Sequence, residues 1–115
     1  MKRSMEQRRT RRFQLELPLS ITRSGAARVT LAGRTKNISS AGVLFTSGNP
    51  PDLGASIEYI ITLIHEPVRP VMLRCVGKVV RMSRANTGED RNVEIAATLE
   101  RYEFMRETTR AAGRI

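Results

Sequence analysis

The sequence is poor in aromatic residues and has almost no cysteine or histidine. It contains three phenylalanines, two tyrosines and no tryptophan in 115 residues, so a core must be built mainly from valine, isoleucine, leucine and alanine. Cys75 is the only cysteine, which excludes an intrachain disulfide and is compatible with a reducing cytoplasm. The only histidine, His65, has no second histidine or nearby cysteine with the spacing of a metal site, so we expect no metal.

Long apolar runs and catalytic motifs are also missing. No segment approaches the roughly 18 apolar residues of a membrane-spanning helix, and residues 13–16 do not continue the basic N-terminus as a secretory signal would. There is no P-loop or dinucleotide fingerprint, and a single histidine gives no support for a Ser/His/Asp or Cys/His arrangement. We therefore expect a cytoplasmic protein, with no membrane span, that is not an enzyme. The length fits one domain.

Positive charge is abundant and is carried mostly by arginine. The 20 cationic residues stand against 11 acidic ones, and only three of the 20 are lysines. Six cations and one glutamate fall within residues 1–12. Arginine presents a planar fork that suits phosphate groups and guanine edges, so this imbalance predicts an anionic partner. A basic terminus that merely improves solubility is the alternative.

Short segments rich in β-branched residues alternate with turn signals along most of the chain. The alternation predicts six strands, near residues 15–23, 27–37, 41–46, 55–65, 71–84 and 92–99. Gly77, inside the fifth, is expected to mark a bulge or a close approach of two backbones. From Glu100 onward the spacing of Tyr102, Met105 and Thr109 predicts a short C-terminal helix. We expect an all-β, six-stranded antiparallel barrel over residues 13–110, which includes this helix, preceded by a flexible basic arm over residues 1–12.

Two short motifs stand out against this background. Arg8 and Arg12 form an R-x-x-x-R pair just before the first expected strand, and residues 37–42 read N-x-S-x-x-G at the junction of the second and third strands. Each motif alone is weak, and the second could simply be a polar turn in which asparagine and serine bind local backbone groups. Their order and their separation of about 25 residues make the combination more specific.

With these two motifs in this order, the sequence resembles the PilZ domain family, bacterial receptors of cyclic di-GMP built on a six-stranded barrel. The resemblance covers roughly residues 5–105, and the segment around Gly77 and Arg81 also resembles a late strand of the family. It implies that the chain binds cyclic di-GMP, a second messenger, and needs no other cofactor. The implied ligand-binding residues are Arg8, Arg12, Asn37, Ser39 and Gly42, with Arg9 and Arg11 as further candidates.

The ligand's chemistry fits these residue types. Cyclic di-GMP carries two phosphodiesters and two guanines, so guanidinium groups can bind its phosphates, fork onto guanine edges and stack on the purines. Asn37 would accept hydrogen bonds from a guanine edge and Ser39 would donate its hydroxyl. Gly42 would permit a positive φ or a close approach of ligand or backbone.

The leading hypothesis is a stand-alone receptor whose arm folds over the nucleotide and whose changed surface relays the signal to an unidentified protein partner. One alternative is a PilZ-like interaction module that binds no nucleotide. Another is a small basic barrel that binds RNA or single-stranded DNA. The scarcity of aromatic residues for base stacking counts against a nucleic acid partner.

Overall fold

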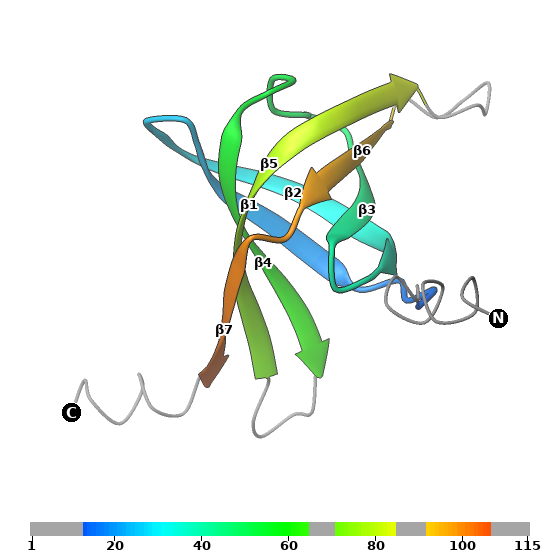
Figure 1. The fold of residues 1–115 in the computed structure, drawn as a ribbon, viewed down its shortest axis with the longest axis vertical. Coiled ribbons are helices and arrows are strands. Elements are labelled where there is room, and N and C mark those ends of the chain that lie inside the picture. Colours follow the sequence, from blue (N-terminus) through cyan, green and yellow to red (C-terminus); the bar gives the residue numbers. More distant parts are fainter. Residues whose placement is uncertain (1–12, 65–70, 85–91, 107–115) are drawn as a thin grey trace, which may run out of the picture.

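The computed structural model describes residues 13–64, 71–84 and 92–106, and these residues form seven antiparallel strands (Figure 1). The strands are β1 (Pro18–Ser24), β2 (Ala27–Ile38), β3 (Gly42–Ser47), β4 (Ser56–Ile64), β5 (Val71–Arg84), β6 (Val93–Thr98) and β7 (Arg101–Arg106). The six strands predicted from the alternating pattern are confirmed as β1 to β6, and their ends differ from the prediction by a few residues at most.

Strands β1 to β6 close into a barrel. The sheet order is β4-β1-β2-β3-β6-β5, and β4 also pairs with β5, so the sheet returns to its first strand. Closure depends on the length of β5. Its Val71–Lys78 part pairs with β4, whereas its other side pairs with β7 up to Val76 and with β6 from Val79 onward.

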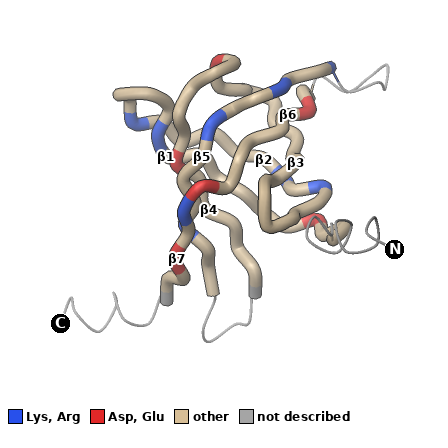
Figure 2. The backbone as a smooth tube through the Cα atoms, viewed as in Figure 1, with Lys and Arg blue, Asp and Glu red and all other residues tan. Residues whose placement is uncertain are grey.

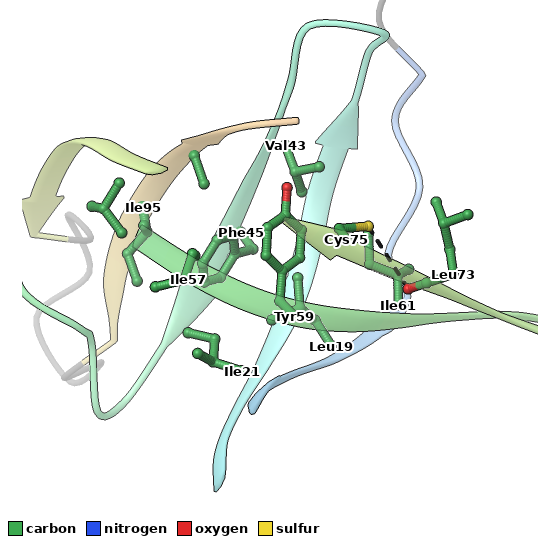
Figure 3. Packing of buried hydrophobic residues seen from close by; sticks show 12 residues of the cluster. Leu19, Ile21, Val43, Phe45, Ile57, Tyr59, Ile61, Leu73, Cys75 and Ile95 are labelled. Carbon is green, nitrogen blue, oxygen red and sulfur yellow. Dashed lines mark hydrogen bonds between the residues drawn. The ribbon is translucent and has the colours of Figure 1, made fainter. Parts of the chain in front are cut away.

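The barrel interior is filled by side chains from every second residue of the strands, because successive side chains point to opposite faces of a sheet. In β4 these are Ile57, Tyr59 and Ile61, all at most 1% exposed, as the period of a strand requires. Ile95 and Ala97 of β6 are buried in the same way. All five belong to one hydrophobic cluster, and Figure 3 shows its labelled members, including Phe45 and Tyr59. The rings of Phe45 and Tyr59 stack with centroids 6.2 Å apart.

Two titratable groups lie in this core and stay neutral. Cys75 is fully buried, and burial raises the pKa of its thiol to about 12. It is thus a small core residue within strand β5. Burial, with smaller contributions from Cys75 and Glu100, also raises the pKa of Tyr59 well above its usual value. The Tyr59 hydroxyl donates a hydrogen bond to the carbonyl oxygen of Thr98, 3.0 Å away.

The helix predicted from residue 100 onward is wrong over its described part, because residues 101–106 form strand β7. The spacing of a few side chains favours a helix here, but the unpaired backbone groups at the edge of β5 favour a strand. The Val71–Val76 part of β5 extends past the end of its pairing with β6, and β7 supplies partners for its backbone groups in six residue pairs. Tyr102 and Phe104 also favour an extended strand.

Several expectations fall on residues outside the described part of the chain. They are the basic arm over residues 1–12, His65, and the continuation of the predicted helix beyond residue 106. The described residues include no helix with the length and apolar character that a membrane crossing requires.

Gly77 lies where β5 changes partner from β7 to β6, and the predicted close approach is confirmed there. A Cβ atom at this position would lie 1.7 Å from the Thr98 carbonyl oxygen.

We expect Gly77→Ala to lower the free energy of unfolding by about 2 to 4 kcal/mol, because two backbones must separate. Urea denaturation followed by circular dichroism measures the change. Lys78→Ala, at the exposed neighbouring position, is the control, and equal losses in both variants would contradict the explanation.

Candidate functional site

The N-x-S-x-x-G motif spans the end of β2, the turn that follows and the start of β3, and Ser39 organises this turn. The backbone N–H groups of Ala41 and Gly42 both donate to the Ser39 hydroxyl oxygen at 3.2 Å. The Ser39 N–H donates to the Gly42 carbonyl at 2.9 Å, and its hydroxyl reaches the same carbonyl at 3.3 Å. These local bonds match the polar-turn interpretation of Ser39, and they set the shape of the turn.

Gly42 is required by a close approach between strands. It has no positive φ, in contrast to Gly25 and Gly54, so only the second of its two expected roles is seen. A Cβ atom at Gly42 would lie 2.7 Å from the carbonyl oxygen of Ala97 in β6. The glycine therefore allows the start of β3 to lie directly against β6.

The chain that follows Arg12 is held beside this turn. Phe13 and Ile38 form an antiparallel bridge, with N–H to carbonyl distances of 2.8 and 2.9 Å in the two directions. Ile38 lies between Asn37 and Ser39. The first described residue after the R-x-x-x-R pair is thus hydrogen-bonded to the middle of the N-x-S motif, although 25 residues separate the two positions in the sequence.

A surface cavity of about 200 Å³ opens next to the turn. It is lined by Asn37, Ser39, Ala41, Gly42, Val43, Leu44, Val80, Arg81, Ala96, Ala97 and Thr98. The three described site residues predicted from the motif therefore share one cavity. The side-chain amide of Asn37 is half-buried and makes no hydrogen bond to the described part of the chain, so its donors and acceptor are available to a ligand.

Sequence reasoning gave no role to the opposite wall of the cavity, which consists of Val80 and Arg81 from β5. Val80 is 54% exposed and offers an apolar surface. Arg81 is exposed and forms no ion pair within residues 13–64, 71–84 and 92–106. The resemblance of residues 77–81 to a family strand was the available signal, but pairing with β6 is what brings Arg81 opposite Ala96 and into the cavity.

The structure thus gathers Asn37, Ser39 and Gly42 around one cavity and adds Val80 and Arg81 to it. The arginines of the predicted arm, Arg8, Arg9, Arg11 and Arg12, lie outside the described residues. The chemistry available at the described site is that of binding, because it combines an amide, an unpaired guanidinium and an apolar platform on a surface open to solvent.

The described residues thus form a small antiparallel barrel with a surface cavity beside the β2–β3 turn. The chain belongs to the PilZ domain family, since the family model of the PilZ domain matches residues 6–110. PilZ domains are a family of cyclic di-GMP receptors and act as binding and adaptor modules rather than as enzymes. No curated protein and no solved structure matches the chain.

The local bonds of Ser39 make a prediction about stability. Ser39→Ala removes an oxygen that accepts two backbone N–H groups, so we expect it to lower the free energy of unfolding by about 1 kcal/mol. Chemical denaturation measures the loss. The control, Ser83→Ala, changes an exposed strand serine for which the described residues provide no hydrogen bond. A Ser39 variant as stable as this control would show that the hydroxyl does not support the turn.

Proposed function

We propose that this PilZ domain binds cyclic di-GMP at the cavity beside the β2–β3 turn and relays the nucleotide's presence to a protein partner. Arg8 and Arg12 of the N-terminal arm hold the phosphates and a guanine, with Arg9 and Arg11 as further contacts. Asn37, Ser39 and Gly42 provide the barrel side of the site. The family resemblance of both motifs and the match over residues 6–110 support this proposal.

The observation that carries the proposal is the bridge between Phe13 and Ile38. It holds the chain one residue after Arg12 at the rim of the cavity that Asn37 and Ser39 line. A ligand in this cavity is therefore within reach of side chains from the preceding residues, because an arginine side chain is long and each additional residue extends the reach by about 3.3 Å.

The cavity walls suit a planar, anionic ligand. The unbonded amide of Asn37 can pair with the edge of a guanine, as asparagine does with a purine edge in nucleic acid recognition. Val80 offers an apolar surface for a base, and Arg81 adds a guanidinium for a phosphate or a guanine edge. Binding neutralises arginines near the rim of the barrel, so the charge presented to a partner changes.

The direct test is calorimetric titration of cyclic di-GMP into the wild type, Arg12→Ala and Asn37→Ala. We expect the wild type to bind and each variant to bind about tenfold or more weakly, because each loses hydrogen bonds to the ligand, charge-assisted in the case of Arg12. Arg28→Ala is the matched control. It removes an exposed arginine near the other end of β2 and should bind as the wild type does.

GTP serves as the control ligand, and no binding of GTP is expected. Absence of both heat and a shift in melting temperature at high concentrations of cyclic di-GMP would contradict the proposal. That outcome would favour an interaction module that binds no nucleotide. Binding of long polyanions with steep salt dependence, and no preference for cyclic di-GMP, would instead favour the RNA or single-stranded DNA alternative.

The same proposal predicts that Arg81 contributes to the affinity for cyclic di-GMP. Arg81→Ala should weaken binding of cyclic di-GMP about fivefold to tenfold, and Arg81→Lys should recover only part of it, because lysine keeps the charge but loses the planar fork. The same titration measures both variants. Arg84→Ala, an exposed arginine at the end of β5 that does not line the cavity, is the control. Unchanged affinity in Arg81→Ala would remove this residue from the site.

A further inference from the structure

Strand β7 forms an open edge of the sheet. One side of β7 pairs with β5 over the six pairs from Val71↔Arg106 to Val76↔Arg101. The other side pairs with no strand in the described part of the chain. Figure 1 shows β7 at the outside of the molecule, beyond β5 and away from β6. An edge strand presents a row of backbone donors and acceptors that another strand can bind.

The face of β7 that continues the barrel interior is aromatic and exposed. In the register with β5, Tyr102 and Phe104 lie opposite Cys75 and Leu73, which are buried. The two aromatic side chains are nevertheless 60% and 65% exposed, because β7 extends the sheet past the barrel wall. Their rings meet edge to face with centroids 6.4 Å apart. Two of the five aromatic residues of this chain are thus left in solvent on one strand.

The opposite face of β7 carries one cation and one anion, Arg101 and Glu103. Figure 2 shows both signs of charge along this strand. Glu103 lies 3.5 Å from Arg74, which also reaches Glu58 at 3.7 Å. Arg101 is exposed and has no ion-pair partner among the described residues. A hollow of about 270 Å³ lies beside these groups, lined by Glu58, Arg74, Val76, Arg101, Tyr102 and Glu103.

We propose that β7 pairs antiparallel with β7 of a second copy of this chain, with Tyr102 at the two-fold axis. An axis perpendicular to the sheet keeps each face on its own side, so one residue must lie opposite itself. Centring on Glu103 brings two carboxylates together, and centring on Phe104 leaves Arg101 without an acidic residue opposite it within β7. Centring on Tyr102 places Arg101 opposite the partner's Glu103, twice by symmetry.

This register satisfies the three open features of β7 together. Residues 101–103 of the two strands lie opposite each other, so the backbone groups of this part of the edge gain partners by strand addition. The two Tyr102 rings meet at the axis, on the same face as Phe104, where cross-strand contact removes apolar surface from water. Arg101, which lacks an acidic partner in the described residues, gains the partner's Glu103. The pairing requires no nucleotide, so it does not depend on the proposed function.

Sedimentation analysis of the protein over a range of concentrations, without nucleotide, tests the proposal. We expect a dimer for the wild type. In Arg101→Glu, residues 101 and 103 are both acidic, and in Glu103→Arg both are basic. Each variant places like charges opposite each other twice, so its dimer dissociation constant should rise about tenfold or more. Circular dichroism checks that both variants keep the barrel.

Mixing the two variants separates the interface from a loss of folding. In a heterodimer of Arg101→Glu with Glu103→Arg, both cross-strand pairs are attractive again, so the mixture should dimerise with about the affinity of the wild type. Arg74→Ala removes the contact within the chain to Glu103 and should remain dimeric, as should Arg28→Glu at the β1–β2 hairpin. Three outcomes would each overturn the proposal. The wild type could be monomeric, one of the single β7 variants could dimerise as the wild type does, or the mixture could stay monomeric.

Discussion

The contact between Thr98 and Gly77 is the constraint on which the rest of the structure depends. The Thr98 carbonyl oxygen approaches the Gly77 backbone so closely that no side chain fits between them. Two further bonds hold Thr98 in place. The buried Tyr59 hydroxyl donates to its carbonyl, and its own hydroxyl accepts the Lys78 N–H at 2.9 Å. Thr98 therefore connects the buried core, through Tyr59, with the point where the chain after β6 crosses β5.

This contact positions both surfaces for which binding is proposed. On one side Thr98 lines the cavity together with Asn37 and Arg81. On the other side the chain leaves Thr98 and enters β7 at Arg101, because the Glu100 N–H donates to the Val76 carbonyl at 2.8 Å and directs the chain along β5. Gly77 thus allows β5 to serve both surfaces. Its Val79–Arg84 part pairs with β6 beside the cavity, and its Val71–Val76 part pairs with β7.

The local sequence pattern was sufficient to predict where strands lie, but not which strands pair with each other. The alternation of Ile57, Tyr59 and Ile61 depends only on the period of a strand, so the sequence alone was sufficient to predict a strand there. The state of residues 101–106 depends on whether β5 has a free edge, which is a property of the whole sheet. The same limit applies at the site. The motif identified Asn37, Ser39 and Gly42, whereas Arg81 joins them only through the pairing of β5 with β6.

Acidic partners divide the described arginines into those already held in ion pairs and those, such as Arg81, that are not. On the β4–β5–β7 face, Arg74 is bound to both Glu58 and Glu103, and Arg23 also reaches Glu58. These guanidiniums are already compensated. At the cavity Arg81 has no acidic partner among the described residues, and the cavity lining contains no carboxylate. An anion that enters there displaces no existing ion pair. It therefore gains the full attraction of the guanidinium, less only the loss of hydration.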